Sequence, residues 1–368
     1  MKLIHTADLH LDSKMKTHLS KDKIKQRKSE LLETFRRMVS YAENNGINNI
    51  LIAGDMFDSA YVSKTTQNIV NNEILTHIDI NFYYLRGNHD VDSFISSYEK
   101  LPDNLFLFED EWKEYKLSDV VSLYAAEFNT HNSKKLYASL LTNPEKINIV
   151  MLHGQDREYA GKDNEEIIAL SEFKNKGIDY LALGHIHSYK CERLDTRGVY
   201  CYPGCLEGRG FDECGEHGFV VIDIDEELKN VSSKFVPFAR RLLYRFEVDI
   251  SGVSSTPEAE SFINDCLIKK REEIVNLNES MIEICLIGKV GLEAEIDADI
   301  LASYYSNDYF YFKVKDETTI AIDYDIYDKD ESLKGEFVRL IKENESLSDE
   351  EKNMIIKTGI GLLSGERL

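Results

Sequence analysis

Five short apolar runs in this sequence each end in Asp, Asn or His, usually beside a glycine or an alanine. The runs cover residues 3–7, 50–53, 82–85, 147–152 and 180–183. Their length and composition are those of buried strands, and helical patterns separate the first three. The order strand, helix, strand, helix, strand is typical of an α/β fold. Ligands bind at the carboxyl ends of the strands in such sheets, so these polar residues predict a functional site.

The side chains at the strand ends are of the kinds that hold transition metals. They are Asp8, His10, Asp55, Asn88, His89, His153, His185 and His187. Imidazole nitrogen combined with carboxylate and amide oxygen favours Mn²⁺, Fe²⁺ or Zn²⁺ over Ca²⁺ or Mg²⁺. These groups exceed what one ion can bind, and one shared carboxylate would divide them between two. We therefore expect a two-metal centre with the ions about 3.5 to 4 Å apart.

Each motif taken alone also has a structural explanation. A single Asp8-x-His10 or a single His153 is more often a capped strand end or a buried, hydrogen-bonded histidine than a metal ligand. The motifs taken together favour the metal centre. His5 lies within the first strand and is predicted to be structural. The histidines that fit no motif are predicted to lie at the surface, and they are His18, His77, His131 and His217.

The motifs resemble the signature of the calcineurin-like metallophosphoesterases. The matching stretches are Asp8-x-His10, Gly54-Asp55, Gly87-Asn88-His89-Asp90, His153 and Gly184-His185-x-His187. The resemblance implies a four-layer α/β/β/α sandwich with a small α+β capping domain and a helical C-terminal tail. It assigns one metal to Asp8, His10 and His187. It assigns the other to Asn88, His153 and His185, with Asp55 as the bridge.

The resemblance also implies a catalytic residue, because His89 matches a family histidine that binds no metal. An imidazole titrates near neutral pH, so His89 could stabilise the transition state and protonate the leaving alkoxide. Asp58 follows Asp55 by three residues, where related phosphatases carry the aspartate that orients this histidine. We therefore expect a catalytic pair of Asp58 and His89. The expected cofactors are two divalent ions, with Mn²⁺ first and Fe²⁺, Zn²⁺ or Mg²⁺ as alternatives.

Within the superfamily, residues 5–12, 54–58 and 87–90 resemble the SbcD-type DNA repair exonucleases. Protein phosphatases carry Gly-Asp-x-x-Asp-Arg-Gly and Gly-Asn-His-Glu, and Ser59-Ala60 and Asp90 break both patterns. Residues 202–213 and the tail from Ser332 are similar to the YhaO-like members. The resemblance implies a homodimeric nuclease that acts on DNA ends with an SMC-like coiled-coil ATPase subunit, SbcC-like or YhaN-like. The alternatives are another phosphoesterase, acting on nucleotides or phosphoproteins, and a non-catalytic DNA-end scaffold for the ATPase.

The charge distribution limits how this chain would contact DNA. The net charge is −22, which argues against a uniformly basic surface that coats nucleic acid. Residues 14–28 nevertheless contain seven Lys or Arg and a single acid, Asp22. Lys14 and Lys16 in this stretch, and Arg209 further along the chain, are candidate contacts to substrate phosphate. A solvated helix face is the alternative for the basic stretch.

The six cysteines are too few for a disulfide framework. Four of them lie between Cys191 and Cys214 but lack the C-x2-C pairs of zinc sites, so we favour small buried thiols over structural zinc. The N-terminus becomes polar too early for a signal peptide, and no apolar run is long enough to span a bilayer. We therefore expect a cytoplasmic protein with no membrane contact.

The length of 368 residues suits a main domain with one or two smaller units. We predict a nuclease domain over residues 1–239, a capping domain over 240–325 and a helical segment over 326–368. The apolar faces of the last two helices could dock on their own chain or on a partner.

Overall fold

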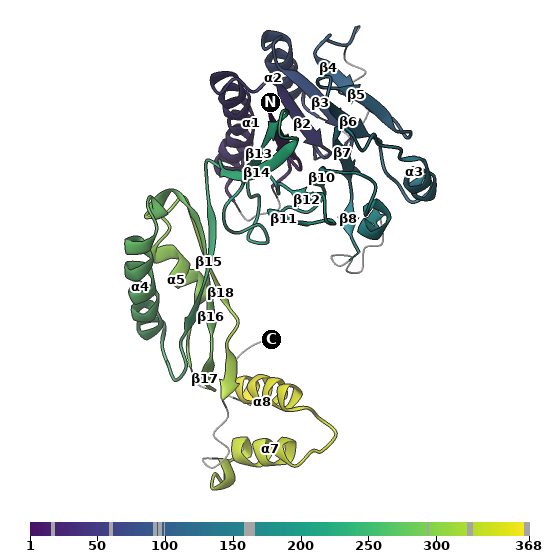
Figure 1. Ribbon diagram of the computed structural model, residues 1–368. Coiled ribbons are helices and arrows are strands. Elements are labelled where there is room, and N and C mark those ends of the chain that lie inside the picture. The colour runs from purple at the N-terminus through teal and green to yellow at the C-terminus, as the bar shows by residue number, and fades with distance from the viewer. Residues whose placement is uncertain are drawn as a thin grey trace. The chain divides into compact units, whose positions relative to one another are not determined.

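The computed structural model describes residues 1–15, 19–58, 62–90, 94, 98, 100–157, 166–292, 294–321 and 327–363. It divides into two compact units, Met1–Leu242 and Leu243–Leu368 (Figure 1). The expected three-part division, with a separate segment from residue 326, stays a prediction. In the part of the chain that is described, no helix is long and apolar enough to cross a membrane.

The first unit contains two six-stranded sheets. The first sheet has the order β14-β13-β1-β2-β3-β4. Its strands are β1 (Lys2–Thr6), β2 (Asn49–Ala53), β3 (Asn81–Leu85), β4 (Leu105–Leu107), β13 (Gly218–Asp225) and β14 (Asn230–Pro237). Strands β1 to β4 are parallel, and β13 pairs antiparallel with β1. The long connections hold helices α1 (Lys21–Asn44) and α2 (Lys64–Thr76).

The second sheet has the order β11-β12-β10-β7-β6-β5. Its strands are β5 (Lys113–Lys116), β6 (Val121–Ala125), β7 (Ile147–His153), β10 (Tyr180–Gly184), β11 (Lys190–Arg193) and β12 (Val199–Tyr202). The four inner strands are parallel, and each edge strand is antiparallel to its neighbour. Helix α3 (Ser133–Ser139), the 3-10 helix η2 (Leu170–Phe173) and the short strands β8 (Gln155–Asp156) and β9 (Ile167–Ile168) lie in its connections.

Alternating side chains on the strands place the two sheets face to face between helices. On β2, Leu51 contributes to the core between the sheets, whereas Ile50 and Ile52 pack with residues of α1 and α2. On β7, Met151 joins the same inner core and Val150 joins an outer core with α3. Successive side chains of a strand point to opposite faces, so each sheet is covered on both sides. The predicted four-layer α/β/β/α sandwich is confirmed.

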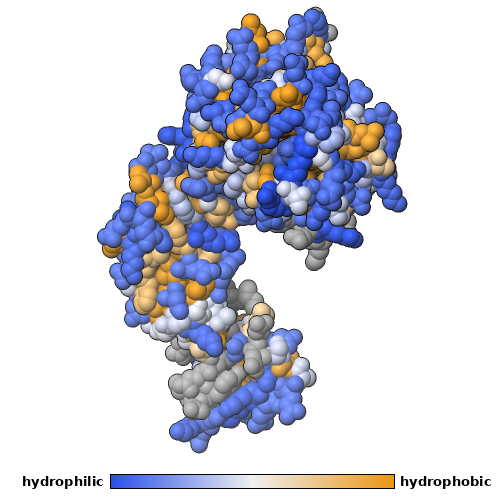
Figure 2. Space-filling view, in the orientation of Figure 1, coloured by the Kyte–Doolittle hydropathy of each residue, from blue (hydrophilic) through white to orange (hydrophobic). Residues whose placement is uncertain are grey.

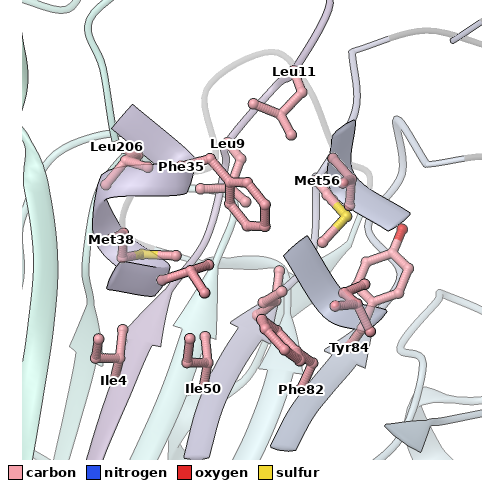
Figure 3. Close-up of a cluster of buried hydrophobic side chains, with 14 of the residues drawn as sticks. Ile4, Leu9, Leu11, Phe35, Met38, Ile50, Met56, Phe82, Tyr84 and Leu206 are labelled. Carbon is pink, nitrogen blue, oxygen red and sulfur yellow. The ribbon is translucent and has the colours of Figure 1, made fainter. Parts of the chain in front are cut away.

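The loops that leave β1 and β2 are anchored in the core beneath α1. Leu9, Leu11 and Met56 are almost fully buried and belong to one cluster with Phe35 and Met38 of α1 (Figure 3). The loop residues therefore alternate between apolar side chains that point into the core and polar ones that do not. This packing holds the chain rigidly where Asp8, His10 and Asp55 lie.

The second unit is an α+β fold around a parallel sheet of order β15-β16-β18. Its elements are β15 (Leu243–Asp249), α4 (Thr256–Glu273), the 3-10 helix η3 (Leu277–Glu279), β16 (Met281–Ile287), β17 (Lys289–Gly291), α5 (Ala298–Tyr304), β18 (Tyr311–Asp316), β19 (Thr319–Ala321), α7 (Leu333–Lys342) and α8 (Asp349–Leu363). Its core joins α4 and α5 to one face of the sheet. Helix α5 was not predicted, because its seven residues are too short for a periodic signal.

The other face of this sheet carries a charged row rather than an apolar core. Glu283 on β16 is 1% exposed, and its carboxylate contacts Arg245 at 2.6 Å and Lys313 at 2.9 Å on the two neighbouring strands.

In the view of Figure 2 most of the surface is hydrophilic, and hydrophobic residues also gather on the second unit. Exposed apolar side chains there include Phe262 and Ile268 of α4.

Candidate metal centre

The predicted ligands come together where the strands of both sheets end. Asp8 and His10 follow β1, and Asp55 follows β2. His153 ends β7, and His185 follows β10 beside it in the second sheet. A hydrogen bond crosses between the sheets here, because the His185 backbone N–H donates to the Asp8 carboxylate at 3.0 Å.

Small residues beside the ligands allow the two sheets to approach each other. A Cβ atom added to Gly184 would lie 1.9 Å from the Ala53 carbonyl oxygen and 2.9 Å from the Ala7 Cβ. One added to Gly54, where φ is +91°, would lie 2.1 Å from His153 Nδ1. The Gly or Ala seen beside the motifs in the sequence is therefore a packing requirement of the site.

Gly184 offers a direct test of this close approach. We expect Gly184→Ala to destabilise the fold by at least about 3 kcal/mol, the upper end of the usual range for overpacking, since the added methyl group would meet backbone. Urea unfolding would measure this change. Gly291→Ala is the matched control, because no atom of the described residues would lie within 4 Å of a Cβ there. Equal stability of the two variants would contradict the packing argument.

Four of the site residues have strained backbones. The φ angles are +52° at Asp8, +42° at His10, +51° at Asp55 and +97° at His185. Residues other than glycine rarely adopt this left-handed region, and each instance costs on the order of 1–3 kcal/mol. Such strain persists only where the surrounding fold imposes it, and it is typical of functional sites.

Two groups of potential ligands lie side by side. Asp8, His10 and His187 form the first, in which the ligand atoms lie within 4.8 Å of one another and the two Nε2 atoms of the histidines are 3.1 Å apart. His153 and His185 form the second with Glu166. The Asn88 Oδ1 joins this group, 3.2 Å from His153 Nε2.

Asp55 lies between the two groups. Its Oδ2 is 3.8 Å from His10 Nε2 in the first group and 3.5 Å from His153 Nε2 in the second. Its Oδ1 accepts a hydrogen bond from the His89 backbone N–H at 3.0 Å. A single carboxylate thus faces both groups, as a bridging ligand would.

The electrostatics of the buried histidines fit bound cations. Burial alone would lower the pKa of His153. The surrounding carboxylates, of which Asp55 has the largest effect, outweigh burial and raise the pKa to about 9. Burial instead lowers the pKa of His10 and His185, so these two rings favour the neutral form that binds metals. Borderline nitrogen and oxygen donors are a donor set suited to two divalent ions.

Glu166 was missed by the sequence analysis. Its Oε2 lies 3.7 Å from His185 Nδ1 and 3.9 Å from His153 Nε2. The residue belongs to none of the five motifs, because it lies in the connection between β8 and β9 rather than at the end of a long strand. No local pattern marks it as part of the site.

Asp58 contacts His10 and Arg209. The Asp58 Oδ1 lies 3.1 Å from His10 Nδ1 and accepts a hydrogen bond of 3.1 Å from Arg209. Ligand atoms of Asp58, His89 and His10 lie within 4.8 Å of one another, but among the described residues no hydrogen bond joins Asp58 to the His89 ring. The positive charge of Arg209 and the His10 ring hold the carboxylate instead. Asp58 is therefore suited to orient His10, and its pairing with His89 stays a prediction.

His89 itself is exposed beside the ligands. Its ring packs edge to face against the His10 ring, with centroids 5.2 Å apart. Asp90 fixes the same loop, because its carboxylate accepts hydrogen bonds from the Gly87 and Phe57 backbone N–H groups, each at 2.9 Å. Burial raises the pKa of Asp90 to about 7. The His89 side chain is thus free to meet a substrate while its backbone is held.

Glu213 is a second residue that the motif analysis missed. Its Oε1 lies 2.7 Å from His187 Nδ1, which leaves Nε2 to face Asp8. Arg209 contacts both residues, at 3.1 Å from His187 Nδ1 and 2.7 Å from Glu213. These contacts occupy the Arg209 guanidinium within the protein, and its proposed contact to substrate stays a prediction.

Glu213 should matter for metal affinity. A carboxylate that accepts a hydrogen bond from the ring N–H of a histidine not facing the metal fixes the orientation of the ring and raises the basicity of the ligating nitrogen. We expect Glu213→Gln to weaken metal binding about 10- to 100-fold. Titration with Mn²⁺ in a calorimeter would measure this. Glu192→Gln, which removes an exposed carboxylate on β11, should leave the affinity unchanged. An unaltered affinity in the Glu213 variant would refute the positioning role.

The remaining sequence predictions have mixed outcomes. Lys14 is exposed, and Lys16 and His18 lie outside the described residues. Arg27 is fully buried and donates to the Gly208 carbonyl at 2.7 Å, so it does not belong to a solvated basic face. His217 is buried rather than exposed, and its Nε2 lies 2.9 Å from the Glu213 carbonyl oxygen.

The other predictions concern His5 and the cysteines. His5 is buried and pairs with the Tyr180 hydroxyl at 2.9 Å, as a structural residue would. The groups of potential metal ligands found among the described residues contain no cysteine.

Comparison with known proteins agrees with this geometry. Residues 1–189, about half of the chain, match the family described as calcineurin-like phosphoesterase. YhaO of Bacillus subtilis, described as an uncharacterized metallophosphoesterase, is 26% identical over 286 residues, which cover 74% of this chain and 69% of that protein. Mre11 of Methanopyrus kandleri, described as a DNA double-strand break repair protein, is 26% identical over 61% of this chain and 54% of its own length.

Mre11 of Saccharolobus solfataricus is 23% identical over 97% of this chain and 94% of that protein. The family match covers β1 through the loop that carries His185 and His187, which is the part of the chain that contains the clustered ligands. This chain therefore belongs to the calcineurin-like phosphoesterase family and is a metal-dependent hydrolase.

Proposed function

We propose that this chain is a two-metal phosphodiesterase that cleaves DNA at its ends, a repair nuclease of the SbcD and YhaO type. The observation that carries the proposal is the position of Asp55 between two ligand groups, with the exposed His89 beside them. The similarity to proteins described as DNA double-strand break repair proteins supports DNA as the substrate.

The side chains divide the work of hydrolysis. When bound, two divalent ions, which we expect to be Mn²⁺, provide a hydroxide nucleophile at neutral pH and neutralise the phosphodiester oxygens. Asp8, His10 and His187 would hold one ion, and Asn88, His153 and His185 the other, with Asp55 shared. His89 is exposed and lies in neither of the two groups that face Asp55, although it is near His10 and Asp58. We propose that it donates a proton to the leaving alkoxide.

The exposed apolar residues of the last two helices support a protein partner. Val338 and Ile356 are fully buried and pack α7 and α8 against each other. Leu333, Leu340 and Met354 on the same helices are 67%, 67% and 71% exposed. We propose that these residues bind the SMC-like ATPase subunit and that the nuclease works as a homodimer.

Hydrolysis assays test the proposal. Purified protein with Mn²⁺ should cleave linear duplex or single-stranded DNA and the model diester bis(p-nitrophenyl) phosphate. Cleavage of p-nitrophenyl phosphate without any cleavage of nucleic acid would instead indicate a phosphatase. Bound Mn²⁺ with no turnover of any substrate, alone or with the ATPase, would favour a DNA-end scaffold. Chelation by EDTA should abolish all turnover.

A further inference from the structure

Two cysteines face each other at the edge of the second sheet. Cys191 on β11 lies directly opposite Cys201 on the antiparallel strand β12. Opposed side chains on antiparallel strands share one face of the sheet. Here it is the inner face, where Cys201 is fully buried and Cys191 packs against the same core while keeping partial exposure. The two thiols are thus neighbours, and one of them can be reached from solvent.

The spacing of the two residues is close to that of a disulfide. Cβ atoms of directly opposed residues on antiparallel strands lie about 4.5–5.5 Å apart, and a disulfide requires about 3.5–4.5 Å. Among the described strands, β11 lies at the edge of its sheet and pairs with β12 alone. A small inward movement of β11 would join the sulfur atoms without breaking the pairing of any other strand.

The surroundings give the two thiols different roles. A hydrogen bond with the Cys201 thiol lowers the pKa of Cys191 to about 7. Burial alone would raise this pKa, and a hydrogen bond with Ser233 lowers it further. The Ser233 hydroxyl on β14 lies 3.6 Å from the Cys191 sulfur. The same thiol contact together with burial raises the pKa of Cys201. Cys191 therefore provides a thiolate near neutral pH, whereas Cys201 retains its proton.

We propose that Cys191 and Cys201 are a modification site, which hydrogen peroxide converts to a reversible disulfide. The Cys191 thiolate attacks one peroxide oxygen, the O–O bond breaks, and the sulfur becomes a sulfenic acid while hydroxide leaves and is protonated to water. The Cys201 sulfur then attacks the Cys191 sulfur, and the S–O bond breaks. The departing hydroxide takes the Cys201 proton, so two thiols and one peroxide yield one disulfide and two waters.

The crosslink would restrain part of the metal centre. His187 lies in the loop that leads into β11, and Cys205 lies in the loop that follows β12. The Cys205 backbone N–H donates to the His187 carbonyl at 3.1 Å. A dithiol reductant would reverse the bond. The inference is independent of the substrate of the enzyme, because it rests on the strand pairing and the surroundings of the two thiols.

Peptide mapping of the oxidised full-length protein tests the proposal. The chain is treated with hydrogen peroxide, free thiols are blocked, and peptides are identified by mass spectrometry without reduction. We expect one linked pair that joins the Cys191 and Cys201 peptides, lighter by two hydrogen atoms, and its loss after dithiothreitol. Oxidation of Cys191 without a link to Cys201, a link from Cys191 to another cysteine, or no reaction would overturn the proposal.

Variants identify the order of the two steps. In Cys201→Ser, Cys191 should stop at a sulfenic acid that dimedone traps, whereas Cys191→Ser should give neither adduct nor link. Cys266→Ser is the matched control, because Cys266 is also partly exposed, and the link should form normally. Dimedone trapping at Cys201 rather than Cys191 would contradict the assigned roles. The mapping of the unmutated protein remains decisive if a variant fails to fold.

Discussion

Replacing His89 by leucine should reduce phosphodiester hydrolysis by about 100- to 10,000-fold while both metals remain bound, since this is the usual contribution of a positioned general acid. The ring is exposed and packs against His10 without forming part of either ligand group around Asp55. Leucine keeps a similar size but cannot donate a proton. Steady-state hydrolysis of bis(p-nitrophenyl) phosphate and metal analysis of the same sample measure the two quantities.

The control for this variant is His131→Leu, which changes another exposed histidine outside the site. Its hydrolysis rate and metal content should match those of the unmodified protein. Loss of both metals from His89→Leu would show that the residue is a ligand. An unchanged rate would show that proton donation comes from another group.

Replacing Asp55 by asparagine should have a different and equally large effect, because it should remove both metals and with them all hydrolysis. Asp55 is 2% exposed and faces His10 and His153 at 3.8 Å and 3.5 Å. Asparagine keeps the shape but loses the negative charge that two cations would share. Metal content after dialysis, measured by inductively coupled plasma mass spectrometry, should fall from two ions per chain towards none.

Asp179→Asn provides the matched control for Asp55. Asp179 is also largely buried, but it precedes β10 at the end of the strand opposite to the ligands and pairs with Arg197 at 2.9 Å. Its variant should retain both metals. If Asp55→Asn kept one tightly bound ion, the carboxylate would serve one ligand group rather than bridge both. Circular dichroism would verify that each variant is folded.

The two variants separate binding from chemistry. His89→Leu should lose turnover with metals present, and Asp55→Asn should lose turnover because metals are absent. A scaffold without catalysis would bind metals through Asp55, but it would show no hydrolysis that the His89 substitution could reduce. The pair of measurements therefore distinguishes the proposed nuclease from that alternative.

Most of the first unit was predictable from sequence. Strands β1, β2, β3, β7 and β10 agree with the predicted apolar runs to within one or two residues, and helices α1 and α2 separate the first three as predicted. The agreement follows from burial on both faces, which makes each strand a short continuous apolar run. Short elements such as α5 gave no such pattern.

The sequence by itself determined the main strands of the first unit and the set of polar residues at their ends, because each of these depends on a few consecutive residues. Only the tertiary structure decided how those residues are held. Glu213 is 26 positions from His187, and Arg209 is 151 positions from Asp58. Arg27 resembles a surface residue until Glu207, 180 positions away, is seen beside it.

The physical reason is that hydrogen bonds and ion pairs depend on distance in space, and no local period records which distant residues will meet. The same reason applies to Cys191 and Cys201, whose opposition depends on the register of β11 and β12. Local chemistry therefore identified the kind of site, and the packing of two sheets against each other arranged its parts.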